Sequence, residues 1–122
     1  MTSSHAVQEA EENRVIAKAT LAAQACLSLT RKDLAAILRT SEPTVSRMSA
    51  GKFGKAVREN ALLFLRIYRS LNAILAGNDR NARGWLMAPN KHLDQVPLNL
   101  MTANMDGMVK VANYLDAMRG KL

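Results

Sequence analysis

The side chains with the clearest chemical pattern in this 122-residue chain are hydroxyls and cations between Thr30 and Lys55. A hydroxyl at a helix N-terminus can donate to phosphate, and an arginine one turn further on can form two parallel hydrogen bonds to a guanine edge. We therefore interpret Arg47 as a base-reading residue. The full set of candidate DNA contacts is Arg31, Ser41, Pro43, Thr44, Ser46, Arg47, Lys52 and Lys55.

Two short helices joined by a tight turn must hold these side chains. Thr30 is a predicted N-cap, and Asp33 completes a short variant of the capping box, so a first helix should begin there. Ser41 is a second predicted N-cap, and Gly51 is a predicted helix stop. This arrangement is typical of a helix-turn-helix, in which one helix enters the DNA major groove. The turn holds Arg39 where many such motifs have glycine, which weakens the expectation of strong DNA binding.

Charge is concentrated on the same segment. The formal net charge is +7, made up of −1 in residues 1–30, +6 in residues 31–69 and +2 in residues 70–122. A basic patch confined to one module indicates neutralisation of phosphates. Binding to a membrane surface would require a basic amphipathic helix or a lipidation signal, and neither is evident. The alternative is that the motif is two helices of an ordinary bundle, with Arg47 a solvated charge.

Few residues are suited to catalysis or metal binding. The chain has two histidines, His5 and His92, and one cysteine, Cys26, and no pair has the spacing of a triad or a metal site. We expect no enzyme activity, no metal, no cofactor and no small-molecule substrate. A buried Cys26 thiol, the absence of a signal peptide and the absence of an apolar run of roughly 18 residues predict a cytoplasmic protein without membrane contact.

The hydrophobic pattern predicts an all-α fold. We expect a flexible N-terminus over residues 1–12, a helix-turn-helix domain with a long connecting helix over residues 13–76, and a second small helical domain over residues 77–122. The long helix, residues 56–75, has only a narrow polar strip, so more than one of its faces must be covered. We expect burial and self-association to cover it. The predicted core stripe of the preceding helix is Val15, Ala19, Ala22 and Cys26.

The last helix should begin near Asn104 and end at Gly120, and it carries two apolar stripes. Met108, Val109, Ala112 and Leu115 would serve the core. The second stripe would then be free for a protein partner, with two cations beyond it, unless both stripes are intramolecular. The candidate partner-binding residues are Val111, Tyr114, Met118, Arg119, Lys121 and Leu122. Upstream, Trp85 is a predicted core anchor.

The C-terminal segment resembles the toxin-binding domain of the Xre/MbcA/ParS antitoxin family. The resemblance rests on Trp85-Leu86, Pro89-Asn90, Leu93, Pro97-Leu98, Leu100, Gly107, Val111, Leu115 and Gly120, joined to an Xre-type helix-turn-helix. It implies a dimer that neutralises a RES-domain toxin, a consumer of NAD, by obstructing the toxin's active site. It also implies repression of the protein's own operon, often more tightly when toxin is present.

Three hypotheses remain open at this point. The first is an antitoxin that binds a toxin and represses transcription. The second is a stand-alone dimeric DNA-binding regulator with no toxin partner. The third is a protein-interaction module in which the helix-turn-helix is only a scaffold.

Overall fold

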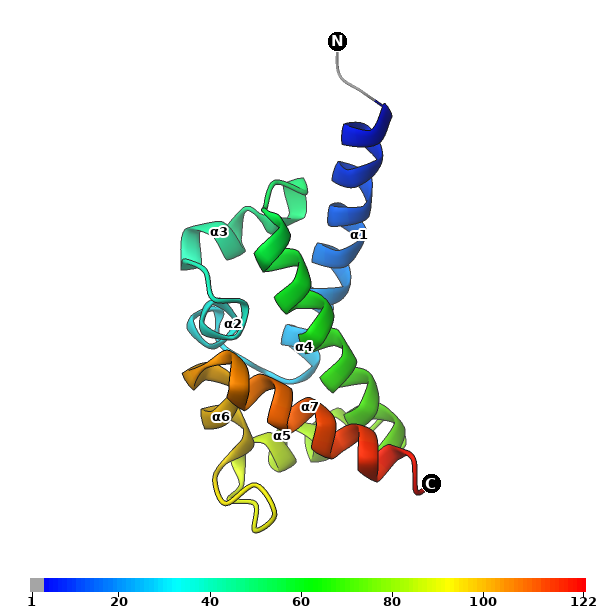
Figure 1. Ribbon diagram of the computed structural model, residues 1–122, viewed down its shortest axis with the longest axis vertical. Helices are drawn as coiled ribbons and strands as arrows, with labels where there is room; N and C mark the ends of the chain where they lie inside the picture. Colours follow the sequence, from blue (N-terminus) through cyan, green and yellow to red (C-terminus); the bar gives the residue numbers. More distant parts are fainter. Residues whose placement is uncertain (1–3) are drawn as a thin grey trace.

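The computed structural model describes residues 4–122, which fold into helices joined by short connections (Figure 1). The elements are α1 (Ser4–Cys26), α2 (Arg31–Leu38), α3 (Glu42–Ser46), the short 3-10 helix η1 (Met48–Ala50), α4 (Lys55–Ile74), α5 (Asp79–Met87), α6 (Pro97–Ala103) and α7 (Met105–Arg119). Residues 4–122 contain no strand, only an isolated bridge between Asn90 and Gln95. The all-α prediction is confirmed.

Polar caps start the helices where the sequence predicts them. Thr30 Oγ1 accepts from the Asp33 N–H at 3.0 Å, and the Asp33 carboxylate accepts from the Thr30 N–H at 3.3 Å, so the capping box is present. Asn104 caps α7 by accepting from the Gly107 N–H at 2.7 Å. Gly51 ends η1 with φ +76°, a left-handed conformation that favours glycine.

Helix α4 is the central element of the molecule. It packs against α1, α2 and α7, which cover several of its faces (Figure 1). Phe64 and Ile67 are fully buried, and Ala61 and Leu71 lie in the same core. The expectation that α4 needs cover on more than one face is confirmed by this packing. Its self-association stays a prediction.

Helix α1 differs from the expectation in two ways. Its described part begins at Ser4, so residues 4–12 are helical rather than flexible, and residues 1–3 lie outside the described part of the chain. This stretch is rich in Ala, Glu and Gln and lacks Gly and Pro, which favours a helix. The predicted core stripe is also wrong, because Val15 is 70% exposed and Cys26 is exposed.

The buried face of α1 is instead a row of small and polar side chains. These residues are Asn13, Ala17, Thr20 and Ala23. Asn13 donates from Nδ2 to the carbonyls of Gly51 and Phe53, both at 3.2 Å. Because these hydrogen bonds join α1 to the chain that follows η1, they select a face that hydrophobic spacing does not reveal.

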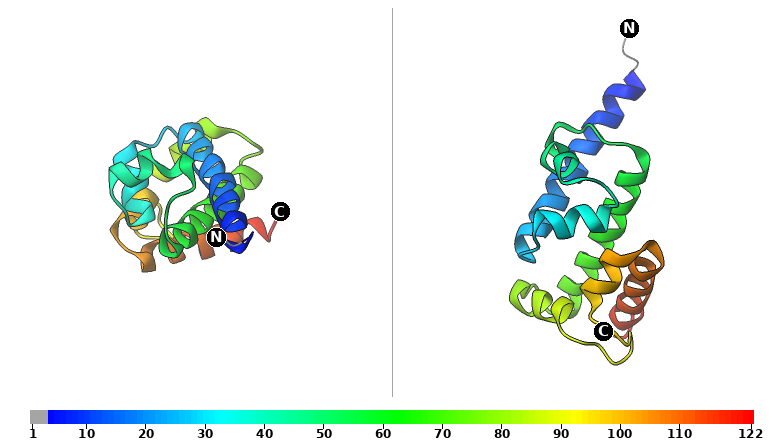
Figure 2. Two further views of the ribbon diagram at one scale, coloured as in Figure 1. Left: turned by 90° about the horizontal axis from the view of Figure 1, so that it is seen from above. Right: turned by 90° about the vertical axis from the view of Figure 1, so that its left-hand side faces the viewer.

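The molecule is elongated, with its helices divided between two ends (Figure 2). Helices α2 and α3 lie alongside α1 and the first half of α4, whereas α5 and α7 lie along the second half of α4, and α6 packs on α7, α2 and α5. The beginning of α1 projects beyond the other helices. Within residues 4–122, none of the helices has the length and apolar character needed to cross a membrane.

Candidate functional site

The α2–α3 motif presents hydroxyls that are held by their own helix. Ser41 Oγ accepts from the Thr44 N–H at 3.3 Å and lies 2.9 Å from Thr44 Oγ1. Ser46 donates its hydroxyl to Glu42 O at 3.2 Å. Ser41 and Ser46 are exposed and Thr44 is half-buried. These hydroxyl oxygens are therefore fixed in place at the start of α3.

Helix α3 is shorter than the second motif helix that the sequence predicts. It spans Glu42–Ser46 and is followed at Arg47 by φ −102° and ψ 2°, which separates it from η1. Val45 and Met48 are buried in the core. Arg47 is exposed and takes no part in the ion pairs found among residues 4–122, so its guanidinium is free to bind a partner.

Two lysines flank the start of α4 next to this motif. Lys52 and Lys55 are exposed, and Gly54 between them is the N-cap of α4 without a side-chain cap. The first turn of α4 has no acidic residue, so no nearby carboxylate offsets the positive end of the helix dipole there. Lys55 lies 3.9 Å from Glu59, an exposed pair of little energetic weight. Of the other predicted DNA contacts, Arg31 and Pro43 are also exposed.

Arg39 lies in the motif turn, where many such motifs have glycine. Its side chain makes contacts that the sequence did not predict. It is the C-cap of α2 with φ 58° and ψ 44°. Its guanidinium donates to the carbonyls of Met101 at 3.0 Å and Thr102 at 3.2 Å, both in α6. Desolvation lowers the pKa of Arg39 from its ordinary value. The motif turn is therefore bonded to the C-terminal helices.

The inward face of α7 includes Met108, Ala112 and Leu115, as predicted, but two other residues differ from the prediction. Val111, expected to meet a partner, is 0% exposed, and Val109, expected in the core, is 43% exposed. Gly107 explains the difference, because a Cβ there would lie 2.0 Å from Leu100 O in α6. This close approach turns the Gly107 side of α7, which includes Met108 and Val111, toward the rest of the fold. The assignment of Val111 to partner binding is corrected accordingly.

The end of α7 carries the remaining candidates for partner binding. Met118 is 37% exposed and Leu122 is 77% exposed, and both cations nearby, Arg119 and Lys121, are exposed. Tyr114 is half-buried, with its ring centroid 6.2 Å from that of Trp85 and 5.7 Å from that of His92.

A small apolar groove of about 50 Å³ runs beside this end of α7. Its walls come from three helices, and the residues are Leu71, Ile74, Leu75, Trp85, Tyr114, Leu115 and Met118. Trp85 is half-buried, so it both packs on the core and lines the groove. The sequence did not predict that α4 contributes to this wall. There, these residues are only additional apolar residues of a long helix.

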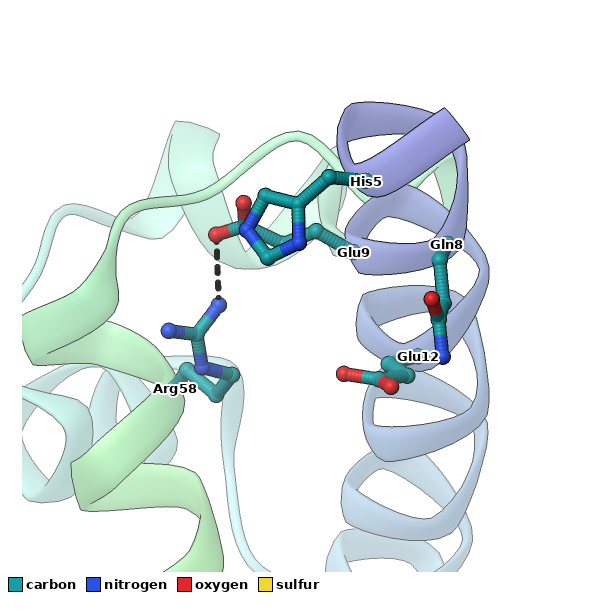
Figure 3. A pocket seen from close by; sticks show the side chains of 5 residues that line it. All are labelled: His5, Gln8, Glu9, Glu12 and Arg58. Atoms are coloured by element: carbon teal, nitrogen blue, oxygen red, sulfur yellow. Dashed lines mark hydrogen bonds and ion pairs between the residues drawn. The ribbon is translucent and has the colours of Figure 1, made fainter. Parts of the chain in front are cut away.

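A second, polar cavity of about 370 Å³ lies between α1 and the start of α4 (Figure 3). Its lining residues are His5, Gln8, Glu9, Glu12 and Arg58. Arg58 Nη1 donates to Glu9 Oε1 at 2.8 Å, and this hydrogen bond lowers the pKa of Glu9. In the described part of the chain, no group of three or more His, Cys, Asp or Glu residues could hold a metal ion. The Glu9–Arg58 ion pair joins α1 to α4.

The fold combines the α2–α3 motif with a group of C-terminal helices that border an apolar groove. Residues 70–121 match the family described as antitoxin Xre/MbcA/ParS C-terminal toxin-binding domain. The family is one of toxin-binding antitoxin domains, and residues 70–121 carry its sequence pattern. The match begins at Ser70, within α4, so the domain takes in the last part of that helix. No curated protein matched the chain.

Proposed function

We propose that this cytoplasmic protein is an antitoxin that binds a RES-domain toxin, obstructs the active site with which that toxin consumes NAD, and represses its own operon through α2 and α3. It acts by binding alone, without catalysis or a cofactor. One observation carries the proposal. A single chain joins residues 70–121, which match a toxin-binding antitoxin domain, to two capped helices, α2 and α3, flanked by exposed cations.

The end of α7 is the proposed toxin contact. Met118 and Leu122 expose apolar surface next to the groove, and Tyr114 forms part of its wall. Apolar and aromatic side chains of this kind dominate the energetics of protein interfaces. Arg119 and Lys121 extend from the same end. A toxin cleft that accepts the pyrophosphate of NAD is sensitive to charge, so these cations are placed to alter the field there.

The motif and the start of α4 are the proposed DNA contact. Arg47 would reach base edges, while Lys52 and Lys55 would neutralise phosphates on either side of Gly54. This surface and the end of α7 lie in different parts of the elongated molecule (Figures 1 and 2). A bound operator therefore leaves the toxin contact accessible, which suits a repressor that also holds its toxin.

Co-expression with the RES-domain toxin of the adjacent gene tests the proposal. We expect one monodisperse complex by size-exclusion chromatography, with no NAD consumption by the bound toxin. Met118→Asp should weaken inhibition by about tenfold or more, because it places a charge in an apolar contact. Val15→Asp is the matched control, since Val15 is also an exposed apolar residue but lies on α1.

Three outcomes are decisive for the competing hypotheses. Separate elution with undiminished NAD consumption would contradict the antitoxin function. If the chain then still bound its own promoter fragment, it would be a stand-alone transcriptional regulator. A complex that inhibits the toxin but never binds DNA would leave the helix-turn-helix as a scaffold.

A further inference from the structure

Arg39 occupies a backbone conformation that most residues avoid. At φ 58° and ψ 44° it is in the left-handed region, where a side chain is strained and glycine is favoured. Its backbone N–H donates to the carbonyls of Ala35 and Ala36, as the C-cap of α2. Glycine would make these backbone hydrogen bonds with less strain, so the side chain must contribute something else.

The side chain of Arg39 connects two helix ends. Nη1 donates to Ala36 O in α2 and to Thr102 O at 3.2 Å, and Nη2 donates to Met101 O at 3.0 Å. Met101 and Thr102 lie in the last turn of α6, where carbonyls lack a partner within the helix. A cation at a helix C-terminus is also favoured by the dipole. The planar fork of arginine offers donors on two separate nitrogens in a fixed geometry, which the single ammonium of lysine lacks.

Other side chains also donate to carbonyls at or just beyond helix ends in this molecule. Arg83 in α5 donates to Leu27 O at 3.0 Å and to Ser28 O, just beyond the end of α1. Asn60 in α4 donates to Leu38 O at 2.9 Å, at the end of α2. Arg39 differs from both because it lies inside the motif turn, next to the N-cap of α3.

We propose that Arg39 is a positioning residue that fixes the recognition helix on the toxin-binding domain, so that DNA affinity depends on the last turn of α6. The proposal rests on the DNA-binding part of the proposed function. Helix α3 spans only Glu42–Ser46, and it packs mainly on α2 and η1. Its orientation therefore follows the turn, and Arg39 sets the turn against α6.

Three full-length variants test this role in a titration with a fragment of the protein's own promoter. Arg39→Gly keeps the left-handed turn and removes the guanidinium. Arg39→Lys keeps the charge but replaces the rigid two-nitrogen fork with a single ammonium. Ala76→Gly is the matched control, because Ala76 also has a left-handed φ, 52°, but lies outside the motif. We expect DNA affinity to fall about fivefold or more in both Arg39 variants, and not in Ala76→Gly.

A second measurement does not depend on DNA. Amide hydrogen exchange should become faster in α3 of Arg39→Gly and Arg39→Lys, while exchange in the centre of α4 stays unchanged. Wild-type exchange in α3, together with wild-type DNA affinity, would overturn the proposal. Full affinity in Arg39→Lys alone would show that Arg39 acts only through its charge and would also overturn it.

The same design separates this proposal from the proposed function. If the wild-type protein binds no promoter DNA, the repressor function fails, and the exchange rates in α3 alone decide whether Arg39 positions that helix.

Discussion

Gly107 shows how a single residue sets the contact between two helices. A Cβ at this position would meet Leu100 O at 2.0 Å and Leu100 C at 2.7 Å, both backbone atoms that cannot move aside cheaply. Gly84 is a useful contrast, because nothing lies within 4 Å of the Cβ that it would carry. Replacing each glycine by alanine therefore tests a different effect. At Gly107 the effect is close packing, and at Gly84 it is helix propensity.

We predict that Gly107→Ala lowers the free energy of unfolding by about 2 kcal/mol or more, because α7 must shift away from α6. Gly84→Ala should raise it by about 0.5–1 kcal/mol, since alanine favours the interior of α5. Urea denaturation followed by circular dichroism measures both values. Equal stabilities for the two variants would show that the α6–α7 approach is looser than the structure has it.

Asp116 links α7 to α4 through charge. Its carboxylate accepts from Arg66 Nε at 2.8 Å and from Ser70 Oγ at 3.2 Å. The hydrogen bond from Arg66 is the main cause that lowers the pKa of Asp116. Since the pKa is lower in the folded state, the pair stabilises the protein above the ordinary aspartate pKa of about 3.9, and this stability is lost as the pH falls through the folded value.

We predict that Asp116→Asn makes the stability of the fold depend less on pH in the acidic range. The difference from wild type should be below about 1 kcal/mol near pH 6, because both side chains are partly exposed and solvent screens the pair. It should shrink toward zero as the pH falls through the lowered pKa of Asp116 in the folded state. Thermal midpoints measured across this range test the sign, with exposed Asp94→Asn as the control. A difference that grows on acidification would refute the assignment.

At the scale of elements, the boundaries of most helices could be predicted, but not which face of a helix is buried. Thr30, Ser41 and Asn104 start helices because a cap acts on N–H groups within its own first turn. Burial depends on distant partners. Val111 is inside because Gly107 lets α7 approach α6, and α1 buries Asn13 because carbonyls beyond η1 need a donor.

In the candidate site, too, some features follow from local sequence and others depend on residues far apart in the chain. The motif, its outward Arg47 and the lysines around Gly54 follow from local sequence. The apolar groove combines α4, α5 and α7, and the bonds of Arg39 reach α6, 62 and 63 residues further along the chain. No local pattern contains such pairs, so these features required the folded structure.

For α3 we predict that Arg47→Ala weakens binding to the promoter fragment by about 1–3 kcal/mol, the loss expected for an arginine that reads a base. The variant should also bind altered promoter sequences with less discrimination. Arg119→Ala removes an equal charge from the end of α7 and should bind DNA as the wild type does. Equal affinities for wild type and Arg47→Ala would show that α3 does not read DNA.

The two proposed contacts lie in different parts of the molecule. Most of the net positive charge lies in the segment that contains the proposed DNA contact. Residues 31–69 carry +6 of the net +7, and this range includes the motif and most of α4. Packing against α1, α2 and α7 covers much of α4, yet Leu62 remains 47% exposed on it. We therefore base the prediction of a second copy less on uncovered surface than on the proposed DNA binding, because paired half-sites require two recognition helices.

We predict that the protein is a homodimer in solution and binds promoter DNA as one. Light scattering coupled to size-exclusion chromatography should give twice the mass of the chain at micromolar concentration. Leu62→Glu tests the exposed part of α4 as the dimer contact, and Val15→Glu on α1 is its control. A monomeric mass for the wild type, with a single chain per DNA fragment, would contradict the prediction.

Trp85 is the only tryptophan of the chain, and it lies in the wall of the apolar groove beside Tyr114. The protein therefore contains its own optical reporter. Indole emission moves to shorter wavelength when water leaves the ring, so a partner that covers the groove would be seen by fluorescence without any label. DNA bound at α3 would leave the same signal unchanged, which allows the two binding events to be followed separately in one cuvette.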